Sequence, residues 1–163
     1  MNIFIIGMPA SGKTTVAARL AKALDKAFVD LDALIEKRAH MFIDTIFDRF
    51  GEETFRRLET EARASLDTTD AVVSCGGGIV TKAENKDLMD GFTVFLETDI
   101  EVLKTRLGHG FSRPLLKETS LESLHDARFL KYRFFADAIV SNDHGPDDAV
   151  RAIITLLEER NIV

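Results

Sequence analysis

The chain has 163 residues, of which 45% are hydrophobic and 29% charged, and its formal net charge is −6. This length and balance predict one globular domain with a sizeable core. The net acidity argues against binding to nucleic acid or to an anionic membrane, so a site for an anionic substrate needs local positive charge. Because Cys75 is the single cysteine and no basic leader opens the sequence, we expect a reducing, cytoplasmic location.

Short apolar runs and helical patterns alternate from the first residues onward. Residues 2–6 form a continuous apolar run, residues 14–24 carry an apolar stripe at helical spacing, and residues 27–32 form a second short run. A strand, a helix and a strand in this span make a βαβ unit. Such a unit implies a parallel sheet with helices on both faces.

Two apolar stripes at helical spacing follow, separated by Gly51. Their members are Ile43, Ile46, Phe47 and Phe50 before the glycine, and Phe55, Leu58, Ala62 and Leu66 after it. The acidic pair Glu52-Glu53 suits the start of the second helix, because negative charge is favourable near a helix N-terminus. The sequence therefore predicts two helices that meet at Gly51.

Three more apolar runs, at 71–75, 93–96 and 138–140, predict further strands, and residues 150–157 predict a closing amphipathic helix. Five buried strands alternating with helices give an α/β fold of three layers, with a central five-stranded parallel sheet. Residues 108–120 break this rhythm, since they carry turn residues and charge without a clear period. We interpret them as a mobile loop.

Residues 7–14 read G-M-P-A-S-G-K-T, which matches the phosphate-loop pattern G-x-x-x-x-G-K-[ST] between a predicted strand and a predicted helix. Backbone N–H groups of such a loop converge on phosphate oxygens, and the helix N-terminus adds partial positive charge. We expect Lys13 to reach the β- and γ-phosphates and the Thr14 hydroxyl to join the shell of a Mg²⁺ ion. A nucleoside triphosphate is the predicted ligand.

A GTPase switch is a weak alternative for this loop. Such a protein carries a base-reading N-K-x-D motif, whereas residues 85–88 read N-K-D-L and come after only three strands. Residues 48–51 match the pattern D-x-x-G of such proteins, but they lie at the end of an apolar stripe at helical spacing and do not follow a predicted strand. A small-molecule kinase fits better, and it requires cationic side chains for the triphosphate and for an anionic acceptor.

Arg128 is the most informative cation, because it lies on an otherwise apolar helical stripe. That stripe consists of Leu121, Leu124, Arg128, Tyr132 and Phe135. A buried guanidinium needs a partner, so Arg128 binds an anionic ligand, forms a structural salt bridge, or extends its charged end to solvent as a snorkelling side chain. Arg56 and Arg57 also fit a solvated helix face that offers acidic partners at a spacing of three residues.

The glycines Gly76, Gly77 and Gly78 follow a predicted strand directly. Open α/β sheets bind ligands at the carboxyl ends of their strands, where missing side chains leave room; a flexible turn is the alternative reading. Asp30 and Asp32 lie at another predicted strand end. If that segment is a strand throughout, the two carboxylates point to opposite faces and serve different partners.

The chain resembles the shikimate kinases along nearly its whole length. The segments that carry the resemblance are G-M-P-A-S-G-K-T-T, F-V-D-L-D, G-E-E-T-F-R-R-L-E, S-C-G-G-G-I-V, S-R-P-L-L and R-F-L-K-Y-R-F-F-A-D, in this order. The phosphate loop alone is shared by many families, whereas the joint set is specific. Met8-Pro9-Ala10 replaces the aromatic-rich loop of many relatives, and an acid that often follows the tyrosine is missing after Tyr132.

This resemblance implies a nucleoside-monophosphate-kinase-like fold in a single domain, 1–163. A substrate-binding subdomain would span about 31–60, and a lid would span about 108–120. The implied reaction moves the γ-phosphoryl group of ATP, with Mg²⁺, to the 3-hydroxyl of shikimate in aromatic amino-acid synthesis.

The resemblance also implies roles for individual residues. Lys13, Asp32 and Arg113 would be catalytic, with Asp32 holding the ring hydroxyls and accepting the attacking proton. Residues predicted to contact ATP are Ala10, Ser11, Gly12, Lys13, Thr14, Thr15, Arg106 and Arg113, with the region near Pro146 bordering the adenine. Residues predicted to contact shikimate are Asp32, Arg56, Gly76, Gly77, Gly78 and Arg128. Metal contacts would come from Thr14 and, through water, from Asp30.

Two rival functions stay open at this point. A gluconate or nucleotide kinase would use the same phosphate loop, and gluconate is also an anionic polyol. A non-catalytic nucleotide-binding regulator is the rival from another class, although the chain retains Lys13, Thr14, Asp30 and Asp32. ATP and shikimate are the expected small-molecule partners, and we expect a monomer.

Overall fold

The computed structural model describes residues 1–107 and 120–163, so all but the last residue of the predicted lid lies outside the described residues. The strands are β1 (Asn2–Ile6), β2 (Ala27–Asp30), β3 (Ala71–Ser74), β4 (Gly91–Glu97) and β5 (Ala138–Ser141). They form one five-stranded sheet in the order β2-β3-β1-β4-β5, and every neighbouring pair is parallel. The predicted five-stranded parallel sheet is confirmed.

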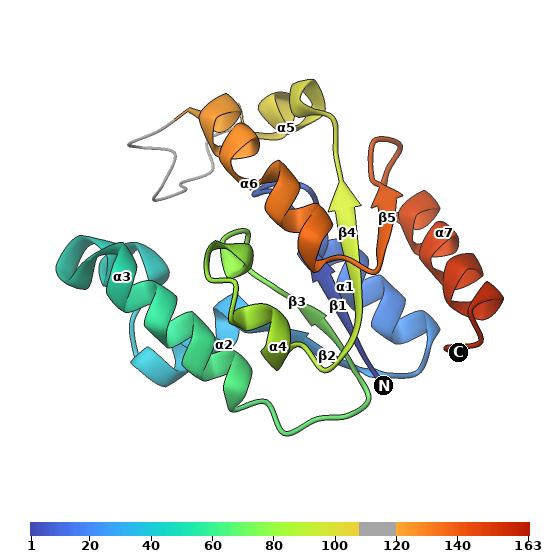
Figure 1. The fold of residues 1–163 in the computed structure, drawn as a ribbon, viewed down its shortest axis with the longest axis horizontal. Coiled ribbons are helices and arrows are strands. Elements are labelled where there is room, and N and C mark those ends of the chain that lie inside the picture. The colour runs from blue at the N-terminus through green and yellow to red at the C-terminus, as the bar shows by residue number, and fades with distance from the viewer. Residues whose placement is uncertain (108–119) are drawn as a thin grey trace.

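The helices cover the sheet, and all but the last of them lie between consecutive strands along the chain (Figure 1). They are α1 (Lys13–Ala23), α2 (Leu31–Ala39), α3 (Ile43–Ala64), the 3₁₀ turn η1 (Ile79–Thr81), α4 (Asn85–Leu88), α5 (Ile100–Leu107), α6 (Leu121–Phe135) and α7 (Pro146–Glu159). None of these helices has the length and apolar content that crossing a membrane would require, as far as the described ranges extend.

Two hydrophobic cores sandwich the sheet, as alternation along β1 illustrates. Phe4 and Ile6 pack in one core with side chains from α2, α3 and α6, whereas Ile3 and Ile5 pack in the other with side chains from α1 and α7. All four β1 side chains are fully buried. Successive side chains of a strand point to opposite faces, so one strand supplies both cores and the three-layer prediction is confirmed.

The predicted break at Gly51 is confirmed, since this residue has φ 82° and ψ 173° inside α3. The stripe predicted after it is right for Phe55 and Ala62, which are buried. It is shifted elsewhere, because Glu59 is buried while Leu58 is only partly covered. The face of α3 that meets the sheet therefore carries charge among its apolar residues, which apolar periodicity alone does not reveal.

The prediction that Asp30 and Asp32 lie on opposite faces of one strand is wrong. Strand β2 ends at Asp30, and Asp32 already belongs to the first turn of α2. The Asp30 carboxylate accepts backbone N–H groups of Asp32 at 3.1 Å and of Ala33 at 3.3 Å. Asp30 is thus the N-cap of α2, and this cap turns the chain out of the strand.

Candidate active site

The phosphate loop joins the carboxyl end of β1 to the start of α1, where backbone N–H groups are open to a ligand. Gly12, the N-cap of α1, has φ 89°. A Cβ atom at this position would also lie 2.5 Å from Nδ2 of Asn142. Both the left-handed backbone and the close contact therefore require glycine at this point of the loop.

Side chains that are distant in sequence hold the loop in place. Nη1 of Arg106 donates to the carbonyl of Ala10 at 3.1 Å, and its Nη2 donates to the carbonyl of Asn142 at 2.9 Å. Nδ2 of Asn142 donates to the carbonyl of Ser11 at 2.7 Å. Nζ of Lys13 donates to the carbonyl of Met8 at 2.8 Å, which places the ammonium group over its own loop.

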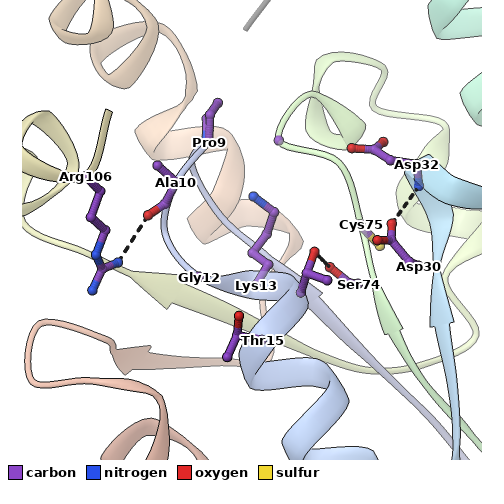
Figure 2. Close-up of a pocket in the computed structure, with 12 residues that line it drawn as sticks. Pro9, Ala10, Gly12, Lys13, Thr15, Asp30, Asp32, Ser74, Cys75 and Arg106 are labelled. Atoms are coloured by element: carbon purple, nitrogen blue, oxygen red, sulfur yellow. Dashed lines mark hydrogen bonds between the residues drawn. The ribbon is translucent and has the colours of Figure 1, made fainter. Parts of the chain in front are cut away.

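A cavity of about 540 Å³ opens at this loop and extends to the carboxyl ends of β2 and β3. Its lining residues are Pro9, Ala10, Gly12, Lys13, Thr14, Thr15, Asp30, Asp32, Ser74, Cys75, Gly77 and Arg106. Figure 2 shows Lys13 extending between Arg106 on one side and the two aspartates on the other. A volume of this size suits a small-molecule ligand.

Oxygen atoms gather where the loop meets β2 and β3. Thr14 Oγ1 and Ser74 Oγ lie 3.3 Å apart and share a hydrogen bond, and Ser74 pairs with Asp30 in the register of β2 and β3. Hydroxyl and carboxylate oxygens are the hard donors that Mg²⁺ prefers, and this ion commonly keeps several waters beside a nucleotide phosphate. The chemistry of this donor set fits the predicted role of Thr14 and Asp30.

The three glycines after β3 let three different groups approach the backbone closely. A Cβ at Gly76 would lie 2.6 Å from Oδ1 of Asp32, and a Cβ at Gly78 would lie 2.1 Å from Nη1 of Arg56. At Gly77 the nearest atom would be Cδ of Pro9, 3.0 Å away. Close packing around this segment therefore favours glycine at all three positions.

Arg56 is buried, unlike its neighbour Arg57. Its side chain is 6% exposed, whereas that of Arg57 is 65% exposed. Nη1 of Arg56 donates to Glu59 at 3.1 Å, its Nε lies 3.4 Å from Glu52, and its guanidinium stacks over Phe55. The solvated-face alternative is thus correct for Arg57 and wrong for Arg56.

Glu59 belongs to this cluster although sequence reasoning did not single it out. It is fully buried. Burial raises the pKa of its carboxyl to about 7, with Arg56 opposing the rise and Asp32 adding to it. Two spacings could have revealed it: Glu59 lies three residues after Arg56 and four after Phe55, on the same side of a helix.

The predicted stripe of α6 is confirmed for all five members, and Arg128 is 6% exposed within it. The hydroxyl of Tyr132, one turn further on, donates to the carbonyl of Gly77 at 2.6 Å, and its ring stacks on Phe95. Burial raises the pKa of Tyr132 to about 12, against the opposing positive charge of Arg128. Helix α6 thereby supports the segment 76–78, called the glycine turn below, through Tyr132. The same buried face of α6 carries the guanidinium of Arg128.

Cys75 lines the cavity but is 1% exposed. Burial raises the pKa of its thiol to about 12, with the negative charge of Glu59 as the next cause. The thiol is therefore protonated at neutral pH, and a protonated thiol is a poor nucleophile.

The cavity walls do not include all of the predicted site residues. Among the described residues, Ser11, Arg56, Gly76, Gly78 and Arg128 are not part of the lining. Arg56 instead contacts Glu59 and Glu52 behind the glycine turn. Pro146 is the first residue of α7, four residues after Asn142, and Arg113 lies outside the described residues.

Comparisons with known proteins identify the family of this chain. The family model described as shikimate kinase matches residues 9–158. A shikimate kinase of Microcystis aeruginosa is 38% identical over 96% of this chain and 86% of its own length, and one of Geobacter sulfurreducens is 39% identical over 97% and 91%.

Comparison with solved structures indicates the same family. A structure titled as shikimate kinase from Acinetobacter baumannii in complex with shikimate superimposes with a TM-score of 0.92 at 32% identity. The match covers 99% of this chain and 95% of that one. By sequence and by structure, the chain belongs to the shikimate kinase family.

Proposed function

We propose that the cavity transfers the γ-phosphoryl group of ATP to the 3-hydroxyl of shikimate, the reaction of the family to which the chain belongs. The observation that carries the residue assignments is the shared cavity, whose lining includes Lys13 and Thr14 of the phosphate loop and Asp32 of α2. Phosphoryl transfer depends on alignment and charge neutralisation, and this arrangement supplies both.

The loop side takes the nucleotide. Backbone N–H groups from Ala10 to Thr15 surround the phosphates, and Lys13 leaves the carbonyl of Met8 to contact the β- and γ-phosphates. Arg106 borders the adenine together with the segment 142–146, which the contacts between Arg106 and Asn142 support. These contacts set where the γ-phosphoryl group stands relative to Asp32.

Mg²⁺ would arrive with ATP, held by the Thr14 hydroxyl and, through water, by Asp30. When bound, the ion supplies positive charge that offsets the charge of the phosphate oxygens. Asp30 suits an indirect contact, because its carboxylate already accepts two backbone N–H groups as a helix cap.

Asp32 holds the acceptor hydroxyl and takes its proton. The hydroxyl oxygen forms the new bond to the γ-phosphorus, the bond from that phosphorus to the bridging oxygen breaks, and ADP leaves. Glycine at position 76 supports this role, because a side chain there would displace the Asp32 carboxylate. A positioned base of this kind typically contributes about 100-fold or more to the rate.

Arg56 and Arg128 bind the shikimate carboxylate from behind the glycine turn. Both are buried cations in a chain of net negative charge. Guanidinium groups suit this task because they bind carboxylates by charge-assisted and potentially bidentate hydrogen bonds. Gly76, Gly77 and Gly78 contact the ring from the same side.

The wider organisation follows from these roles. Residues 31–60, which include α2 and most of α3, form the substrate-binding subdomain of a single domain, 1–163. The predicted lid at about 108–120, with Arg113 assigned to the phosphates by the resemblance, lies outside the described residues except for Ser120. We expect a cytoplasmic monomer; the single cysteine supports the reducing location.

The test is ADP production from Mg·ATP with shikimate, quinate or gluconate as the acceptor. We expect turnover with shikimate alone, and a kcat lower by about 100-fold or more in Asp32→Asn. Asp126→Asn is the matched control, because the Asp126 side chain is 86% exposed and outside the site. Turnover with gluconate instead would refute shikimate as the acceptor. No ADP production with any of the three acceptors would refute the kinase assignment.

A further inference from the structure

Glu59 and Arg56 form a buried ion pair behind the glycine turn. Their side chains are 1% and 6% exposed, and Oε1 of Glu59 accepts from Arg56 at 3.1 Å. The second oxygen, Oε2, is buried without a hydrogen-bond partner within the part of the chain that the structure describes. A buried carboxylate with one unpartnered oxygen is costly as an anion.

Several charged or titratable groups face Glu59 from the surrounding elements. Arg56 lies on the same helix, Asp32 on α2 and Cys75 after β3, while α6 contributes Arg128 and Tyr132. A Cβ placed at Gly76 would be 2.6 Å from Oδ1 of Asp32 and 3.1 Å from Oε2 of Glu59. The two carboxylates therefore flank one backbone position, and the cations are the groups that offset their charge.

A carboxylate ligand bound at Arg56 and Arg128 changes this balance. It adds one negative charge to a pocket that already contains Asp32 and Glu59, and it shares the guanidinium that stabilises the Glu59 anion. Both effects favour the neutral form of Glu59, whose buried Oε2 would then be free to carry the proton. Glu52, the other acid on Arg56, is 46% exposed and so is solvated by water.

We infer that shikimate binding is coupled to the uptake of about one proton by Glu59, which leaves Arg56 to the substrate carboxylate. This inference rests on the proposed function, because it takes the shikimate carboxylate to be the ligand of Arg56. Glu59 is thus a positioning residue that occupies Arg56 in the free enzyme and gives up its charge when substrate arrives.

The coupling has a defined pH range. Burial raises the pKa of free Glu59 to about 7, so its carboxyl is mostly ionised at pH 8 and mostly protonated at pH 6. A nearby substrate carboxylate raises that pKa further. Proton uptake is then large at pH 8 and small at pH 6, and the Kd for shikimate rises with pH above about 7, by up to about tenfold per pH unit.

The test is isothermal titration of shikimate into the protein with saturating Mg·ADP, which prevents turnover. Runs at pH 8 in HEPES and in Tris, whose ionisation enthalpies differ, give the number of protons taken up. A second pair of buffers at pH 6 completes the series. We expect roughly 0.5 to 0.9 proton at pH 8 and near zero at pH 6.

Two variants assign the proton. Glu59→Gln keeps the shape and an acceptor oxygen but cannot titrate, so it should take up no proton and flatten the pH dependence of Kd. Glu52→Gln is the matched control, because it removes the other acid on Arg56, and it should behave like wild type.

Three results would overturn the inference. Shikimate binding in wild type with a heat independent of buffer at pH 8 would refute proton coupling while leaving the proposed function intact. Uptake that persists in Glu59→Gln would place the proton elsewhere. The absence of saturable shikimate binding would refute both this inference and the proposed function.

Discussion

The two halves of the site are built in different ways. The nucleotide half uses one contiguous segment, residues 7–15, whose backbone faces the cavity and is anchored by Arg106 and Asn142. The acceptor half collects side chains from α2, α3 and α6 around the glycine turn, and several of them are buried charges. A backbone cradle is a local structure, whereas a buried charge cluster exists only when its partners meet.

The glycine turn is the junction of these halves. Gly77 lies against Pro9 of the phosphate loop, while Gly76 and Gly78 lie against Asp32 and Arg56. Tyr132 holds the turn through the carbonyl of Gly77. Substitutions in and around this turn can therefore separate the two halves experimentally.

Among changes in and around the glycine turn, the largest expected effect comes from Gly78→Ala. The new Cβ would lie 2.1 Å from Nη1 of Arg56, so the guanidinium must move. A displacement of this kind should lower kcat/KM for shikimate by about 100-fold. Steady-state kinetics with varied shikimate measures this loss, and ADP titration should show an unchanged nucleotide Kd.

Gly77→Ala is the matched substitution on the other side of the turn. Its Cβ would meet the ring of Pro9 at 3.0 Å, so it should weaken nucleotide binding more than shikimate binding. An unchanged shikimate KM in Gly78→Ala would show that Arg56 does not need its observed position.

The next effect concerns the pH dependence of the free energy of unfolding. It arises from the buried Glu59 in the acceptor half of the site, whereas the backbone of the phosphate loop does not titrate. The pKa of Glu59 rises from 4.5 to about 7 on folding, mainly through burial. The folded state then binds more protons than the unfolded state between these pH values, so stability falls as pH rises from 5 to 8. The expected loss from this group is about 2 kcal/mol.

Glu59→Gln lacks the titrating group and should not show this loss. Its free energy of unfolding relative to that of wild type should therefore rise by about 2 kcal/mol between pH 5 and pH 8. Urea unfolding at pH 5 and at pH 8 measures the difference, and Glu52→Gln should follow wild type. Parallel pH profiles for wild type and Glu59→Gln would mean that Glu59 is ionised in the folded protein at pH 5.

Arg106→Ala should have a smaller effect, confined to the nucleotide half. The change removes two hydrogen bonds that tie the phosphate loop to the segment after β5. We expect a rise of about tenfold in the Kd for ADP, which corresponds to about 1.4 kcal/mol, and an unchanged KM for shikimate.

The control for this variant is Arg19→Ala. It breaks an exposed ion pair with Asp147 at 2.7 Å, which should contribute little. Equal ADP affinities in Arg106→Ala and Arg19→Ala would mean that the anchoring contacts do not shape the cradle.

The smallest effect is expected for Tyr132→Phe. The ring would keep its stacking on Phe95, but the carbonyl of Gly77 would lose its hydroxyl partner. We expect a loss of about 1 kcal/mol in the free energy of unfolding, measured with urea. A fully stable variant would show that packing alone holds the glycine turn.

Much of this protein follows from local pattern. Apolar runs predicted the five strands, and Gly51 predicted the break between the two helical segments. The stripe through Arg128 and Tyr132 is buried as expected. The phosphate loop could be recognised because its ligand contacts come from the backbone of one short segment. Such features depend on neighbours in sequence, which hydrogen bonding and periodicity reveal directly.

Other features depended on which elements meet in space. Asp30 became a helix cap because the chain turns at the end of β2, so the period-two argument for the aspartates did not apply. Arg56 and Arg57 are adjacent and chemically alike, yet one is buried and the other solvated. Their difference arises from the orientation of α3 toward the glycine turn.

The sequence by itself determined the layered α/β fold, the phosphate loop and the set of residue types available for a carboxylate-bearing acceptor. Only the tertiary structure decided that the buried side chains of Glu59, Arg56 and Arg128 gather beside Asp32. The physical reason is that the charge state of a buried group depends on desolvation and on partners from other elements, and neither is written in a local stretch of residues.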